Sequence, residues 1–188
     1  NGRYDGGTRL SWPAGFDWVL MTRDSVMLLD RETGQFRTHL INGDRSLGAP
    51  RTGTLGVAPI TDAASSCDTV VAFQKATGRT TTGTLVNGVY TAKTVRSVPT
   101  DLDRVVATCD SVLFVPTSPF ASALTATTAT LSGGTLGGLT ARFPLFPAVG
   151  YVSTNDTVIG LRGYGGAVDY VATLKGGRMM MTGFATRI

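Results

Sequence analysis

Acidic side chains that recur at a regular interval are the first candidates for chemistry in this sequence. Each is the Asp of a short phrase in which Ser or Thr and then Val follow directly, and the four are Asp24, Asp68, Asp110 and Asp156. They are 44, 42 and 46 residues apart. Four carboxylates around a central channel could bind a cation, but an Asp also forms turns by accepting backbone N–H groups. Because a residue repeated in every unit is usually part of the scaffold, we expect these aspartates to form turns.

The two cysteines occupy the same place in adjacent repeats, directly before the Asp of each phrase. Cys67 and Cys109 could form a disulfide if their Cα atoms lie within about 7 Å of each other. Equivalent positions of neighbouring hairpins are that close only near the axis of a small ring. The sequence therefore leaves two alternatives open, a disulfide or two free thiols. Two cysteines and one histidine do not supply the ligand spacing of an ordinary zinc site, so we predict no metal.

Signals for catalysis are weak. His39 is the only histidine, and the nearest serine phrase, residues 43–48, lacks the Gly-x-Ser-x-Gly spacing of a nucleophile elbow. The glycine runs 133–138 and 163–166 precede no helical pattern, which a phosphate-binding loop would require. We therefore predict no catalytic residue and no cofactor, and we expect His39 to be an ordinary strand or surface residue.

Turn signals divide each repeat into four short strands. Apolar runs stand before and after the Asp, as in residues 18–21 and 26–29, and predict a β-hairpin. A second turn, with glycine in three of the four repeats, leads to a Thr-rich third strand. An Asn-Gly or Gly-Gly pair such as Asn87-Gly88 then predicts the tightest kind of hairpin turn, since both central positions need a positive φ. A fourth strand, residues 89–95 in the second repeat, closes the unit.

Four-stranded units of about 40–50 residues are typical of the blades of a β-propeller. We predict an all-β protein that is a single β-propeller domain, or a fragment of one, over residues 1–188. Its four antiparallel blades are expected at approximately residues 16–56, 57–101, 102–145 and 146–188. A β-trefoil would have three repeats rather than four, and an immunoglobulin-like sandwich would not explain four copies of one phrase. Another repeat-built β-fold is the remaining alternative.

The start of the sequence predicts a surplus strand. Asn1-Gly2 precedes Asp24 by the same 23 residues that separate Asn87-Gly88 from Asp110, so residues 1–11 match the fourth strand of a further blade. An unpaired strand of this kind invites pairing with another chain. We therefore expect part of a larger ring, five-bladed for example, that a second chain or segment completes. Four blades that close alone, with the surplus strand on an outer edge, are the alternative.

Composition favours an exported protein. Charged residues make up 16% of the chain, below the roughly 25% of ordinary soluble domains, and glycine occurs 24 times. The first residue is Asn rather than Met, so we expect a processed or excised chain, and the loss of an export signal upstream is compatible with this. No apolar run approaches the ~18 residues of a membrane-spanning helix. The net charge of +4 is scattered rather than clustered, which argues against nucleic acid as a partner.

Aromatic and charged residues at the start of the inner strands are candidates for ligand binding. Asp17-Trp18 in the first repeat corresponds to Asp103-Arg104 in the third. A Trp or Arg beside an Asp at a blade junction could stack on a sugar ring and form hydrogen bonds with its hydroxyls. Packing between blades is the alternative role, because large aromatic side chains dominate core contacts.

The phrase, its Thr-Gly turn and the sequence Asn87-Gly88-Val89-Tyr90 resemble the repeats of secreted bacterial tachylectin-like β-propeller domains. The resemblance covers nearly the whole chain, and the fourth repeat departs from it with Gly165-Gly166 at the Thr-Gly turn. It implies a five-bladed ring and carbohydrate binding at repeated sites between blades. No sugar-binding motif of the family carries over residue by residue.

We therefore expect a lectin-like module of an exported, extracellular protein that binds a glycan or a cell-surface polysaccharide and is not an enzyme. The alternative is a protein-interaction or assembly scaffold, or the propeller domain of a larger secreted protein. An enzyme with its active site on the propeller face ranks third, because the sequence offers no histidine and acid constellation for it.

Overall fold

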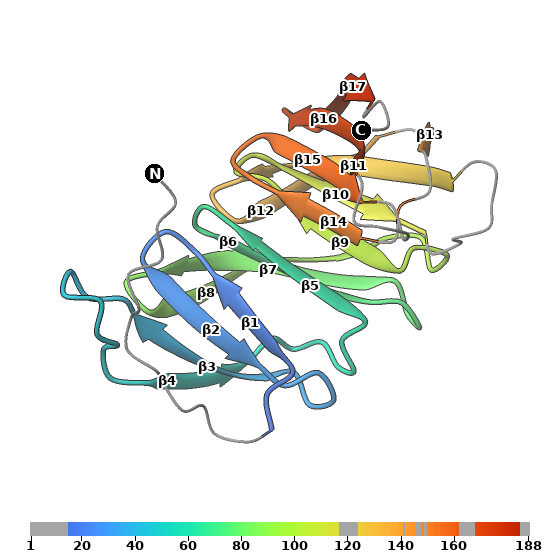
Figure 1. Cartoon of the computed structure of the whole chain (residues 1–188). Coiled ribbons are helices and arrows are strands. Elements are labelled where there is room, and N and C mark those ends of the chain that lie inside the picture. Colours follow the sequence, from blue (N-terminus) through green and yellow to red (C-terminus); the bar gives the residue numbers. More distant parts are fainter. Residues whose placement is uncertain are drawn as a thin grey trace.

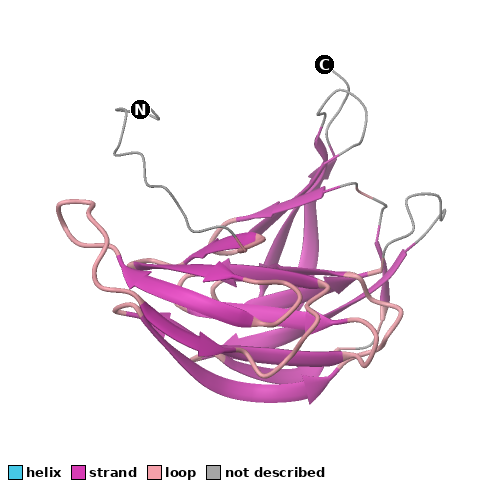
Figure 2. Ribbon diagram, turned by 90° about the horizontal axis from the view of Figure 1, so that it is seen from below, coloured by secondary structure: helices cyan, strands magenta, loops and turns pink. Residues whose placement is uncertain are grey.

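Four antiparallel sheets follow one another along the chain in the computed structural model (Figure 1). The structure describes residues 15–116, 124–140, 142–145, 148, 150–161 and 168–184. All regular secondary structure within these ranges is β-strand (Figure 2). The predicted surplus strand, residues 1–11, lies outside the described residues.

Each sheet is an up-and-down meander whose strands pair in chain order, and we call the four sheets blades 1 to 4. Blade 1 contains β1 (Trp18–Met21), β2 (Ser25–Leu29), β3 (Gln35–Leu40) and β4 (Arg51–Thr54). Blade 2 contains β5 (Asp62–Ser66), β6 (Thr69–Gln74), β7 (Arg79–Val86) and β8 (Val89–Ser97). Blade 3 contains β9 (Arg104–Ala107), β10 (Ser111–Val115), β11 (Leu124–Ser132) and β12 (Thr135–Leu139), and β13 (Phe143–Leu145) also pairs with β11. Blade 4 contains β14 (Gly150–Ser153), β15 (Thr157–Leu161), β16 (Val168–Lys175) and β17 (Arg178–Phe184).

The first strands of successive blades lie beside one another: β1 contacts β5, β5 contacts β9, and β9 contacts β14. The second strands, β2, β6 and β10, are buried along their whole length. Strands covered on both faces are mainly apolar, which explains the continuous apolar runs after the first three repeated aspartates. This arrangement confirms the predicted all-β propeller of four-stranded antiparallel blades.

Apolar cores fill the three junctions between blades. Leu20 and Met27 of blade 1 pack with Leu85 of blade 2 in the first of them. At the second junction the rings of Phe73 and Phe114 meet edge to face, with 6.1 Å between their centroids. A third core joins blades 3 and 4. The stability of the fold therefore comes mainly from contacts between blades, as in other repeat proteins.

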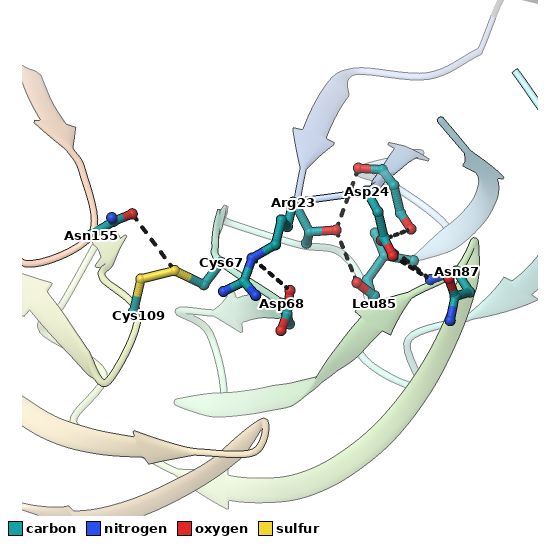
Figure 3. A network of polar contacts seen from close by, with 10 residues as sticks. Arg23, Asp24, Cys67, Asp68, Leu85, Asn87, Cys109 and Asn155 are labelled. Atoms are coloured by element: carbon teal, nitrogen blue, oxygen red, sulfur yellow. Dashed lines mark hydrogen bonds and ion pairs between the residues drawn. A yellow bond between two sulfur atoms is a disulfide. The ribbon is translucent and has the colours of Figure 1, made fainter. Parts of the chain in front are cut away.

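The repeated Asp joins one blade to the next. The Asp24 carboxylate accepts the backbone N–H of Asn87, at 3.1 and 3.2 Å (Figure 3). The Gly88 N–H donates to the Ser25 hydroxyl oxygen at 2.8 Å. Ser25 in turn donates to Asp24 at 2.6 Å. Blade 1 is thus fixed to the third hairpin turn of blade 2. We expected the aspartates to form turns, and the acceptor role is present, but the donors belong to a turn in the following blade.

The same contacts recur at the third junction, between blades 3 and 4. The Asp110 carboxylate accepts the Gly176 N–H at 3.1 Å, and the Ser111 hydroxyl accepts the Gly177 N–H at 2.8 Å. Both partners of these bonds repeat along the chain. The Asp-Ser pair of one blade and the Asn-Gly or Gly-Gly turn of the next blade therefore form one inter-blade contact.

In blades 2, 3 and 4 the glycine at the second position of this turn (Gly88, Gly134 and Gly177) lies against the third strand of the preceding blade. Its carbonyl accepts a threonine hydroxyl from that strand, as in Thr38 to Gly88 at 2.6 Å and Thr82 to Gly134 at 2.6 Å. A Cβ on Gly88 would lie 2.7 Å from the Leu40 nitrogen, and Gly88 has a φ of +71°. Glycine is therefore required here both for its backbone conformation and for the close approach.

A disulfide between Cys67 and Cys109 joins blades 2 and 3, with 5.1 Å between the two Cα atoms (Figure 3). Backbone hydrogen bonds continue the connection on either side of it. The Arg23 N–H donates to the Cys67 carbonyl, and the Cys109 N–H donates to the Asn155 carbonyl, both at 2.8 Å. The residue before each repeated Asp thus connects all four blades in series.

Candidate functional site

A hollow of about 250 Å³ opens between the innermost strands of blades 2, 3 and 4. Its walls are the start of β5, the start of β9 and two residues of β14, namely Asp62–Ser65, Arg104–Val106, Tyr151 and Ser153. These segments meet because each is the first strand of its blade and successive first strands lie side by side. Main-chain and side-chain polar groups from three blades therefore surround one space.

Asp62 is the only acidic residue among the described residues that line the hollow. Its carboxylate accepts the Val105 N–H at 2.8 Å, which joins blade 2 to blade 3. Burial raises the pKa of Asp62 above its ordinary value, although the N–H groups of Val105 and Ala63 and the charge of Arg104 act against this rise. A half-buried carboxylate of this kind is a strong acceptor for a hydroxyl that enters the hollow.

Arg104 brings a positive charge to the same hollow. It is the first residue of β9 and is exposed, and it pairs with Val115 just as Asp62 pairs with Phe73. Tyr151 of β14 lies on the other side and packs against the core between blades 3 and 4. A carboxylate and a guanidinium thus lie in one hollow with a tyrosine ring whose hydroxyl is buried, and they suit binding of a polar ligand by hydrogen bonds and ring contact.

The described residues that line the hollow do not include the acid pair of a glycoside hydrolase. Hydrolysis of a glycosidic bond ordinarily needs two carboxyl groups on either side of the bond, one as acid and the other as base or nucleophile. The residues that line the hollow supply one, Asp62.

The four predicted binding residues do not form one site. Asp17 is exposed, and its carboxylate accepts the Arg31 N–H at 2.8 Å, which fixes the end of β2. Trp18 is half-buried against the core between blades 1 and 2. Asp103 forms an ion pair with Lys75. Arg104 lines the hollow, whereas the other three are not among the residues that line it.

Sequence reasoning missed Asp62 and Tyr151. The signal for Asp62 was present, since Asp62 has the same place in β5 that Trp18 has in β1 and Arg104 in β9. Aligning the second repeat with the other two by strand register would have found it. Nothing in the pattern of the fourth repeat distinguishes Tyr151 from a packing residue.

The single histidine lies away from the residues that line the hollow. His39 belongs to β3, and its Nδ1 is 2.9 Å from the Gly48 carbonyl oxygen. Among the described residues, no three His, Cys, Asp or Glu side chains gather as metal ligands. The described part of the chain also contains no helix that is long and apolar enough to cross a membrane.

Comparison with known proteins identifies the fold and goes no further. The sequence matches no protein-family model and no curated protein. A candidate 6-phosphogluconolactonase from Bacteroides uniformis superposes with a TM-score of 0.54 and 8% identity, over 87% of this chain and 52% of the other. A protein from Lactobacillus plantarum superposes with a TM-score of 0.50 and 13% identity, over 90% of this chain and 55% of the other.

Both solved structures are propeller-like, and the chain spans about half the length of each. At identities this low the likeness establishes the propeller architecture alone, since one fold hosts many functions. The resemblance to tachylectin-like domains and the five-bladed ring that it implies stay predictions.

Proposed function

We propose that this chain is a lectin-like β-propeller module that binds a carbohydrate in the hollow between blades 2, 3 and 4 and catalyses no reaction. The observation that carries the proposal is the convergence of Asp62, Arg104 and Tyr151 from three different blades on one hollow. Charged groups here can form hydrogen bonds with sugar hydroxyls, and the tyrosine ring offers an apolar surface to a sugar face.

The second part of the proposal is that the protein is exported. A disulfide persists in oxidising compartments and is rare in the cytosol, so the Cys67–Cys109 bond supports an extracellular location. The low content of charged residues supports it as well. Such a module would meet glycans or polysaccharides on a cell surface, either alone or as the propeller domain of a larger secreted protein.

The proposal is tested with a glycan array and titration of the best ligand by calorimetry. We expect Arg104→Ala to weaken binding by roughly 10- to 100-fold, since hydrogen bonds to a charged group contribute about 1.5–3 kcal/mol. Arg51→Ala is the matched control, because Arg51 is an exposed arginine at the start of β4, outside the hollow. A flat array, or equal losses in both variants, would contradict carbohydrate binding at this hollow.

The charge of Asp62 predicts a dependence of stability on pH. Because burial raises its pKa, ionisation of Asp62 destabilises the folded state. This cost is absent well below the ordinary Asp pKa of 3.8 and appears as the pH rises above that value. Asp62→Asn keeps an oxygen that can accept the Val105 N–H but removes the charge. We expect the variant to melt a few degrees higher than the wild type at pH 7, and at the same temperature at pH 3.

Thermal unfolding of both proteins across this pH range measures the effect. Equal melting temperatures at pH 7, or a difference that persists at pH 3, would contradict the ionised state assigned to Asp62. Asp62→Asn should also weaken carbohydrate binding while it raises stability, a combination expected of a binding residue and not of a purely structural one.

A further inference from the structure

Arg104 is the only basic residue among the described residues that line the hollow. It is exposed, and its guanidinium forms no ion pair and no hydrogen bond with a described residue. Other basic side chains on the same side of blades 2 and 3 are engaged. Lys75 pairs with Asp103, and Arg142 donates two hydrogen bonds to Asp101. The positive charge of Arg104 therefore has no partner among the described side chains.

The acidic groups around Arg104 are held by other partners. Asp103, its neighbour in the chain, forms the ion pair with Lys75. Asp62 holds the Val105 N–H at 2.8 Å, and burial raises the pKa of its carboxyl. Asp62 is also half-buried, whereas Arg104 is exposed. Of the two charges in the hollow, the positive one is therefore the more accessible to a ligand that enters from solvent.

Blade 4 leaves space beside Arg104. Arg104 pairs with Val115 in blade 3 as Gly150 pairs with Leu161 in blade 4, so Gly150 holds the equivalent place. Glycine brings no side chain, and among the described residues a Cβ there would have only the Leu161 side chain within 4 Å, at 3.8 Å. Asp62 holds the same place in blade 2. The first residues of three neighbouring inner strands thus supply a carboxylate, a guanidinium and an open position.

A ligand that matches these groups carries an anionic group for Arg104 and a hydroxyl for Asp62. The planar guanidinium presents paired N–H groups that fit a carboxylate, and such charge-assisted bonds are about twice as strong as neutral ones. A uronic acid, which is a sugar whose C6 is a carboxylate, carries both groups on one ring. The hollow, at about 250 Å³, is smaller than the roughly 300–1,000 Å³ of ordinary ligand pockets, so it suits a single sugar residue.

We infer that the hollow binds a uronic acid residue of an acidic polysaccharide, with the sugar carboxylate on Arg104 and a ring hydroxyl on Asp62. This inference rests on the carbohydrate binding proposed above, because it names the class of sugar for the same hollow. A neutral sugar would offer Arg104 only hydroxyl groups, which form weaker hydrogen bonds. The net charge of +4 also favours the approach of a polyanion.

Calorimetric titration at pH 7 tests the inference with pairs of ligands that differ in one charge. The ligands are the methyl glycosides of glucuronic and galacturonic acid and the methyl esters of both, which keep the ring and its hydroxyls but lack the charge. We expect one of the two acids to bind about tenfold more tightly than its ester, since hydrogen bonds between two charged groups are stronger than those to a neutral one. This preference should fall as salt is added.

Variants locate the carboxylate. Arg104→Ala should reduce the preference for the acid to about twofold or less, and Arg104→Lys, which keeps the charge but loses the planar fork, should retain part of it. Asp62→Asn should weaken the binding of acid and ester without lowering their ratio. Arg51→Ala is the matched control, because it removes the same charge outside the hollow and should leave the ratio unchanged. Far-UV circular dichroism verifies that each variant is folded.

The outcomes separate this inference from the proposed function. Equal affinity of the wild type for acid and ester, or tighter binding of the ester, would overturn the uronic acid assignment and leave carbohydrate binding intact. A preference that persists in Arg104→Ala would place the carboxylate away from Arg104 and overturn it too. If neither these ligands nor any sugar of the glycan array binds, both the inference and the proposed function fail.

Discussion

Replacing Cys67 and Cys109 together by serine is expected to lower the free energy of unfolding by about 4 kcal/mol, the value that chain entropy gives for a loop of this length. The disulfide closes a segment of 42 residues, which is nearly a whole repeat. It therefore restricts the unfolded chain over the full distance from the inner hairpin of blade 2 to that of blade 3. Urea unfolding followed by far-UV circular dichroism measures the loss.

Reduction of the wild-type protein provides the control. A thiol reductant should lower the stability of the wild-type chain to that of the double-serine variant, and it should leave the variant unchanged. If the reductant destabilises both proteins equally, the effect does not come from this bond. If neither reductant nor substitution lowers the stability, the two cysteines do not form the disulfide.

Most strands and turns could be predicted from the sequence, because the residues that specify each of them lie within the same repeat. An Asn-Gly pair adopts positive φ at both positions, so Asn87-Gly88 predicts the hairpin between β7 and β8 that the structure contains. The third blade is less regular than its sequence suggests. Its strand β11 pairs with both β12 and β13, and the residues that replace the Thr-Gly turn there, Pro119-Phe120, lie outside the described ranges.

Contacts between blades could not be predicted in the same way, since nothing local specifies them. An Asp in a turn phrase favours hydrogen bonds with nearby N–H groups, yet Asp24 accepts from Asn87, which is 63 residues away. The candidate site also depends on contacts between blades. Arg104 was predicted from its type and position, but its neighbours Asp62 and Tyr151 belong to other blades and meet it only in the folded protein.

The hairpin glycines that touch the preceding blade should be among the least replaceable residues of the chain. Gly88→Ala is expected to lower the free energy of unfolding by about 3 kcal/mol, the sum of about 1 kcal/mol for a left-handed backbone and about 2 kcal/mol for overpacking. The added methyl group would lie 2.7 Å from the Leu40 nitrogen, in strand β3 of blade 1. Relief of this contact would pull the turn away and lengthen the bonds from Gly88 to Ser25 and from Thr38 to Gly88.

Gly133→Ala separates the two contributions, because Gly133 also has a positive φ, +52°, but a Cβ there would meet nothing within 4 Å. Gly133→Ala should therefore lower the free energy of unfolding by about 1 kcal/mol, from the left-handed backbone conformation alone. Urea unfolding of both variants gives the comparison, and the difference between them measures how tightly the turn packs against the neighbouring blade. Equal losses would mean that the turn does not approach strand β3. A larger loss of unfolding free energy in Gly88→Ala would instead show that the tight turn stabilises the junction between blades as well as its own hairpin. Such turns would then contribute to the specific pairing of one blade with the next.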